Sequence, residues 1–206
     1  MSGVDIVVIG ANDGVSNMPD DKFLIEQVQQ KGKSALLVEP YSPSFEKLKA
    51  NYGDFNVVFE RAAITLHDGT TNLYVPVESD HEFIKNNFLC SVSESFARDA
   101  SYCYKAPRFE TVQVPCMTFA SLMSKHGITD IWTLLIDAEG YDAEIILSID
   151  FSAIKVDRLI FESASTDGHG ARGPNFEKCV YRLRKSGFTR FIPSDQFGFS
   201  TIAEKP

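Results

Sequence analysis

The sequence has no long hydrophobic run. No window approaches the roughly 18 consecutive apolar residues that a membrane-spanning helix needs. Its first ten residues, MSGVDIVVIG, contain no basic segment followed by a long apolar stretch, so they do not resemble a secretion signal. We therefore expect a protein that is neither exported nor inserted in a membrane, and that has no membrane partner.

Cysteine is scarce. The four cysteines are Cys90, Cys103, Cys116 and Cys179, and no two of them form a C-x-x-C pair. A fold stabilised by disulfides would need more cysteines in a chain of this length. We expect reduced thiols and a cytoplasmic location.

An excess of positive charge is missing too. The 206 residues carry a formal net charge of -8 at pH 7, which disfavours a phosphate polymer as the main partner. Basic residues between Arg172 and Arg190 alternate with apolar ones in a helical pattern, which is typical of a solvated helix face. We expect no nucleic-acid partner, and the sequence gives no indication of the oligomeric state.

What is present is an alternation of strand-like and helix-like segments along a chain long enough for one domain, residues 1–206. Strands are expected at residues 5–9, 35–38, 56–59, 132–136 and 158–161. Helices are expected at 20–31 with Asp20 or Asp21 at its start, from Pro43, at 119–126, at 141–148 and around Phe176, Val180 and Leu183. This alternation predicts an α/β fold: a Rossmann-like, doubly wound, mostly parallel sheet with helices on both faces.

Two regions depart from this alternation. Residues 72–77 and 110–114 look extended, and about 78–110 form an irregular insert that suits a cover over a substrate. The tail, residues 189–203, is expected to add one or two edge strands, of which at least one is antiparallel.

Three acidic or glycine-rich signatures follow expected strands, where open α/β sheets bind ligands. They are Gly10-Ala11-Asn12-Asp13-Gly14, Glu39-Pro40 and Asp137-Ala138-Glu139-Gly140. Glycine lets the backbone turn and approach a ligand closely, although a strand-to-helix turn often needs glycine for turning alone. A carboxylate at Glu39 can accept hydrogen bonds from both ribose hydroxyls of an adenosine cofactor, or it can stabilise the following helix start.

The first signature is not the dinucleotide pattern G-x-G-x-x-G, because Asn12 and Asp13 stand where the middle glycine would clear space for a pyrophosphate. The carboxylate of Asp13 would repel a pyrophosphate but tolerate the ammonium and sulfonium of S-adenosylmethionine. S-adenosylmethionine is therefore favoured over NAD. A nucleotide-dependent Rossmann-like oxidoreductase remains the alternative enzyme, and a catalytically inactive binding module the alternative outside enzymes.

Four segments in order resemble the FkbM-type family of class I S-adenosylmethionine-dependent methyltransferases. They are VVIGANDG at 7–14, LLVEPYSPSFEKLKANY at 36–52, ERAAI at 60–64 and LLIDAEGYDAEIILSIDF at 134–151. The resemblance implies O-methylation of a hydroxyl on a sugar or small natural product. It also implies that the 10–14 turn, including Ala11 and Asp13, borders the methionine part of the cofactor. Glu39 with Pro40 would then hold the ribose, and Ala62 and Ala63 would border the adenine. Asp137 and Glu139 would face the transferred methyl.

Methyl transfer needs a deprotonated nucleophile, so Asp137 or Glu139 is the expected general base. His169, on a glycine-rich loop, is an alternative base. Together with Glu162 the two carboxylates would also suit Mg²⁺ or Ca²⁺, but no spacing demands a metal and none is favoured.

Overall fold

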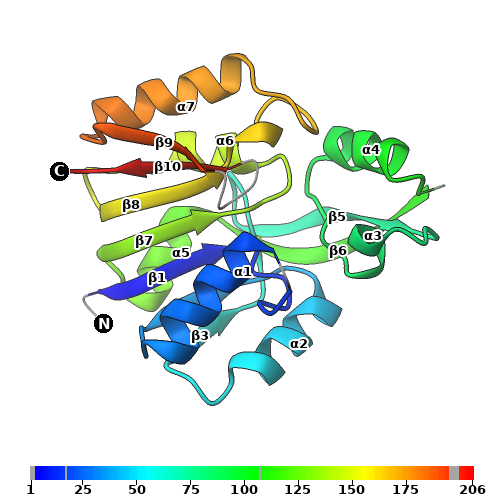
Figure 1. Cartoon of the computed structure of the whole chain (residues 1–206), viewed down its shortest axis with the longest axis horizontal. Coiled ribbons are helices and arrows are strands. Elements are labelled where there is room, and N and C mark those ends of the chain that lie inside the picture. Colours follow the sequence, from blue (N-terminus) through cyan, green and yellow to red (C-terminus); the bar gives the residue numbers. More distant parts are fainter. Residues whose placement is uncertain (1–2, 17, 107, 195–199) are drawn as a thin grey trace.

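The computed structural model describes residues 3–16, 18–106, 108–194 and 200–206. Within these residues the main sheet has seven strands, in the order β3-β2-β1-β7-β8-β10-β9 (Figure 1). Their bounds are β1 Val4–Ile9, β2 Ala35–Val38, β3 Val57–Glu60, β7 Asp130–Ile136, β8 Lys155–Glu162, β9 Arg190–Ser194 and β10 Ser200–Glu204. The order in which successive strands are added to the sheet reverses between β1 and β7, and open α/β sheets bind ligands at such a point.

The first five strands in this order are parallel, and β10 is antiparallel to both β8 and β9. This confirms the predicted Rossmann-like, mostly parallel sheet with an antiparallel edge near the C-terminus. Every predicted strand from residues 5–9 to 158–161 is found within two to three residues of its expected bounds. Residues 195–199 of the predicted tail lie outside the described residues.

Helices cover both faces of this sheet. They are α1 Pro19–Leu24 with its π-helical continuation η1 Ile25–Gln30, α2 Ser42–Tyr52, α5 Phe119–His126, α6 Asp142–Ser148 and α7 Pro174–Lys185, and a 3-10 turn, η2, spans Ser163–Ser165. No described helix has the length and apolar character that crossing a membrane requires.

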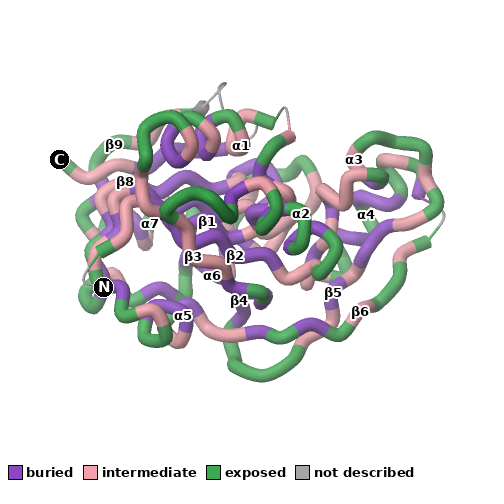
Figure 2. The backbone as a smooth tube through the Cα atoms, turned by 90° about the horizontal axis from the view of Figure 1, so that it is seen from below, coloured by how far each residue is buried: buried purple, intermediate pink, exposed green. Residues whose placement is uncertain are grey.

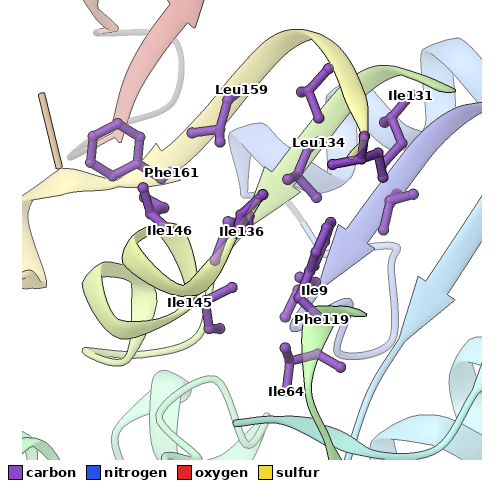
Figure 3. Close-up of a cluster of buried hydrophobic side chains, with 14 of the residues drawn as sticks. Ile9, Ile64, Phe119, Ile131, Leu134, Ile136, Ile145, Ile146, Leu159 and Phe161 are labelled. Atoms are coloured by element: carbon purple, nitrogen blue, oxygen red, sulfur yellow. The ribbon is translucent and has the colours of Figure 1, made fainter. Parts of the chain in front are cut away.

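Alternate residues of the central strands explain why both faces are covered. On β1, Ile6 and Val8 are buried against α1, η1 and α2, whereas Val7 and Ile9 are buried with α5 and α6. Figure 3 shows the second of these clusters, in which Ile9, Leu134 and Ile136 meet side chains of α5 and α6. Figure 2 shows the resulting pattern, with buried backbone through the central strands and exposed backbone on the outer side of the helices.

A second, smaller sheet lies beside the first, in the order β4-β6-β5 (Figure 1). Its strands are β4 Ala63–Ile64, β5 Gly69–Val77 and β6 Arg108–Met117, and β5 pairs antiparallel with β6 over its whole length. The extended segments predicted at 72–77 and 110–114 are therefore confirmed as parts of longer strands.

The insert between these strands contains two helices where the sequence indicated no regular element. They are α3 Glu82–Lys85 and α4 Glu94–Cys103, begun by side-chain caps from His81 and Ser93. Phe96 and Ala100 of α4 are buried with Ile84 and Leu89 in a cluster of their own. The apolar positions are too few and too closely spaced for helical periodicity to be recognised in the sequence.

Candidate functional site

A cavity opens at the C-terminal ends of β1, β2 and β7, and it brings together most of the predicted site residues. Those that line it are Gly10, Ala11, Asn12, Glu39, Pro40, Ala62, Ala63, Asp137 and Glu139. Residues from four separate segments of the sequence thus meet at the point where the strand order reverses.

The turn after β1 is held directly against the turn after β7. The Asp137 backbone N donates to the Ile9 carbonyl over 2.9 Å, and Gly10 and Ala11 both donate to the Val38 carbonyl over 3.0 Å. Gly10 has a φ of 82°, and a Cβ at this position would lie 1.8 Å from the Asp137 carbonyl oxygen. Only glycine fits here, because both the backbone conformation and the space exclude a side chain.

Asn12 and Glu39 join the ends of β1 and β2. The Glu39 carboxylate accepts hydrogen bonds from the backbone N of Asn12 over 3.0 Å and from the backbone N of Tyr41 over 2.7 Å. Burial raises the pKa of Glu39 to about 7, against the lowering effect of these two bonds. Asn12 has a φ of 44° and its side-chain amide donates to the Asn86 carbonyl, so it also connects the turn to the insert.

Asp13 and Gly14, the last two residues of the signature, face a different neighbour. Tyr52 of α2 donates from its hydroxyl to the Gly14 carbonyl over 2.6 Å, and a Cβ on Gly14 would lie 2.6 Å from the Tyr52 ring. The Asp13 side chain accepts from the Val15 backbone N, and its carbonyl accepts from Asn51. These two residues anchor the turn to α2, and the cofactor contacts implied for them stay predictions.

The second sheet and the insert supply apolar cavity walls that sequence reasoning did not identify. These walls are formed by Ile64, Leu73, Phe88, Cys90 and Val92 beside the predicted Ala62 and Ala63. No local signal marks these residues, because the two sheets come together only through tertiary packing. Walls of this kind suit the face of a flat aromatic ring.

Acidic side chains gather at the other end of the cavity. Asp20 and Asp21 of α1, which the sequence suggested only as helix-starting residues, line the cavity with Asp137 and Glu139. Burial and neighbouring acids raise the pKa of Asp20 to about 7, and burial raises that of Asp21 to about 6. Burial, followed by the charge of Glu162, raises the pKa of both Asp137 and Glu139 well above the ordinary range.

Asp142 fixes the acidic turn to the neighbouring strand. Its fully buried carboxylate accepts from the Ala138 backbone N over 3.1 Å and from the Glu162 backbone N over 3.0 Å. The turn after β7 and the end of β8 are thereby cross-linked by one side chain. Asp142 positions the acids rather than facing the cavity, and only its place five residues after Asp137 could have suggested this in the sequence.

His169, the alternative base, lies against the insert. Its ring contacts Phe96 and Tyr104 at centroid distances of 5.5 and 5.3 Å, and burial lowers its pKa. Phe96 in turn packs on Gly140, where a Cβ would come within 2.5 Å of the phenyl ring. His169 is not among the cavity-lining residues, so the structure brings Asp137 and Glu139, but not His169, to the cavity.

Comparison with known proteins gives a family and two distant structural likenesses. Fibrillarin from Aeropyrum pernix, in complex with natively bound S-adenosyl-L-methionine, superposes with a TM-score of 0.45 at 9% identity, over 98% of this chain and 66% of that chain. A protein from Thermoplasma acidophilum assigned as a methyltransferase superposes with a TM-score of 0.42 at 14% identity, over 99% of this chain and 69% of that one.

The present chain thus spans about two thirds of the length of each of these structures. No curated protein sequence matches it. The model of the methyltransferase FkbM domain matches residues 9–189, from the end of β1 to the start of β9, and the chain belongs to this family.

Proposed function

We propose that the protein transfers a methyl group from S-adenosylmethionine to a hydroxyl of a sugar or small natural product. The observation that carries this proposal is the charge of the cavity. Five carboxylates line it, those of Asp20, Asp21, Glu39, Asp137 and Glu139, and none of the described lining residues is Lys, Arg or His. Such a cavity repels a pyrophosphate and attracts a sulfonium and an ammonium.

We place the cofactor in the cavity in the orientation that the lining residues favour. The turn at Gly10 and Asn12 faces the methionine part, and Glu39 takes the ribose, since each of its oxygens accepts one backbone N–H and keeps lone pairs for the hydroxyls. Pro40, Ala62 and Ala63 border the adenine. The sulfonium then lies beside the acidic turn, which stabilises its positive charge.

The transfer itself requires alignment and removal of one proton. When bound, S-adenosylmethionine would supply the methyl group and a neutral thioether as leaving group. Asp137 or Glu139 would hold the acceptor hydroxyl within about 3 to 3.5 Å of the transferred methyl and take its proton. Burial raises the pKa of both groups, which makes either carboxylate a stronger base once it has lost its own proton.

We assign this activity to one domain, residues 1–206, in which the insert at about 78–110 covers the acceptor side. Ser91 donates to the Glu139 carbonyl over 2.7 Å, and Asn87 and Phe88 line the cavity. The insert therefore contacts the acidic turn directly and is well placed to select the acceptor.

Ligand-dependent thermal unfolding tests the cofactor assignment. S-adenosylmethionine and S-adenosylhomocysteine at 100 times their dissociation constants are each expected to add about 2.7 kcal/mol of stability, whereas NAD adds none. Stabilisation by NAD alone would overturn the proposal in favour of a nucleotide-dependent oxidoreductase.

Two variants separate binding from transfer. We expect Glu39→Ala to weaken cofactor binding, and Asp137→Asn to abolish turnover with cofactor affinity nearly unchanged. Asp54→Asn, an exposed acid at the end of α2, is the matched control and should behave as wild type. Unchanged affinity in Glu39→Ala refutes the ribose assignment, and binding without turnover in the wild type, across hydroxylated acceptors, supports an inactive binding module instead.

A further inference from the structure

Three carboxylates converge at the end of two neighbouring strands. Because Ile136 of β7 pairs in register with Phe161 of β8, the residues that follow, Asp137 and Glu162, stand side by side. Glu139 adds a third carboxylate from the same turn as Asp137, in a left-handed conformation with a φ of 50°. One carboxylate oxygen of each of the three lies within 4.8 Å of the other two.

Two of the acids in this region have a buried oxygen without a partner. Within the described part of the chain, Oε2 of Glu162 and Oδ1 of Asp20 accept no hydrogen bond. The other oxygen of Glu162, Oε1, accepts a hydrogen bond from the Ser165 hydroxyl over 2.7 Å. A buried carboxylate oxygen without a donor is costly, so these oxygens require a cation or protons.

Asp142 provides the contrast within the same cluster. It is more deeply buried than the others, yet each of its oxygens accepts a backbone N–H. The chain thus satisfies the one acid that holds the turn in place. By contrast, the buried oxygens Oδ1 of Asp20 and Oε2 of Glu162 have no donor among the described residues, and the second of these belongs to the cluster with Asp137 and Glu139, so the cluster points to a ligand from outside the chain.

The methyl donor does not supply enough charge for the four acids other than Asp142. S-adenosylmethionine carries an ammonium, a sulfonium and a carboxylate, which leaves a single net positive charge. When all four carboxyls are ionised they carry four negative charges, and a divalent ion together with the methyl donor would neutralise three of these. Hard divalent cations prefer oxygen ligands, and carboxylates are their commonest protein ligands.

We propose that Asp137, Glu139 and Glu162 hold a hard divalent cation, of the Mg²⁺ or Ca²⁺ class. Two ligands of one ion are separated by at most twice the metal–oxygen distance, which is about 4.2 Å for Mg²⁺ and about 5 Å for Ca²⁺. The three oxygens lie within 4.8 Å of one another, which is inside this limit for Ca²⁺, and Mg²⁺ would require them to move closer together.

Three protein ligands leave coordination positions open for other oxygens. This part rests on the proposed function: the open positions suit an acceptor with two neighbouring oxygens, such as a vicinal diol. An ion so placed would orient the acceptor hydroxyl and lower its pKa, which eases loss of the proton to the neighbouring carboxylate or to water.

The test is calorimetric titration of the chelator-treated full chain with MgCl₂, CaCl₂ and MnCl₂. Each titration is carried out with and without S-adenosylhomocysteine, and electron paramagnetic resonance follows Mn²⁺ binding in parallel. We expect one site, and a loss of affinity of at least about 10-fold in Glu162→Gln. Glu177→Gln, an exposed acid on α7, is the matched control and should bind as wild type. Glu139→Gln serves as the second variant, and thermal unfolding verifies that each variant is folded.

The proposal is overturned if the wild type shows no saturation below about 10 mM of any ion in either condition, because known protein sites reach about 10⁻³ M. Equal affinity of folded Glu162→Gln and wild type also overturns it. Failure here is distinguishable from failure of the proposed function. Donor binding without ion binding removes only the cation site, and ion binding without donor binding removes only the methyltransferase assignment.

Discussion

The buried carboxyl of Glu39 makes the stability of the unliganded protein depend on pH in a direction opposite to that of an ordinary paired acid. Burial raises its pKa from 4.5 to about 7 in the folded chain. The folded state therefore binds the proton more tightly than the unfolded state does. The resulting stability is fully present below the unfolded pKa, and it is lost as the pH rises through about 7.

The magnitude follows from the difference between the two pKa values. Each pKa unit corresponds to about 1.36 kcal/mol, so Glu39 alone contributes about 3 kcal/mol over its full range. Most of this falls between about pH 5 and about pH 8. Glutamine keeps the size and one acceptor oxygen but does not titrate, so Glu39→Gln removes this contribution to the pH dependence.

Urea unfolding of the unliganded wild type and of Glu39→Gln at several pH values measures the effect. We expect the stability of the wild type relative to the variant to fall by about 2 to 3 kcal/mol from about pH 5 to about pH 8. Glu177→Gln, with an exposed carboxyl, should show no such pH-dependent difference. A constant difference between wild type and Glu39→Gln at all pH values would refute the assignment of a raised pKa to this group.

Three further substitutions test the packing that builds the cavity. Gly10→Ala should destabilise far more than Gly32→Ala, since both have a positive φ but only Gly10 lacks space for a Cβ; equal melting temperatures would contradict this. Tyr52→Phe removes the buried hydrogen bond to the turn after β1 and should lower the free energy of unfolding by about 1 kcal/mol. An unchanged denaturant midpoint would show that this bond does not stabilise the fold. Phe96→Ala should lower the free energy of unfolding by about 3 to 5 kcal/mol, measured by calorimetry. Tyr102→Ala, on the exposed side of α4, should leave it almost unchanged, and similar losses in the two variants would contradict the burial of Phe96.

The sequence was sufficient for the main sheet because each central strand carries its own signal. Ala35–Val38 is apolar throughout and is buried on both faces, and Gly127 ends α5 in the left-handed conformation that its glycine favours. Each of these signals lies within one segment of the sequence, so it can be recognised without knowing which other segments pack against it. They failed for α3 and α4, whose apolar positions are buried in a cluster of their own that forms only when the insert folds.

The candidate site divides in the same way. The positions of Gly10, Glu39 and Asp137 after apolar strands placed them at one edge of a parallel sheet, and the cavity does bring them together. The sequence alone could not show that Gly14 turns toward Tyr52 rather than toward the cavity. Nor could it show that Asp20 and Glu162, from segments more than a hundred residues apart, join the acids at that edge.

By itself, then, the sequence determined the strands, their parallel arrangement and the chemical types of side chain at their ends, because these depend on periodicity and on the residues next to each strand. The tertiary structure alone decided which acids share one charged cluster and which of them lack a donor. It also decided which apolar residues close the cavity. Charge repulsion, burial and hydrogen-bond satisfaction depend on distances between segments remote in the chain, and only the folded structure sets those distances.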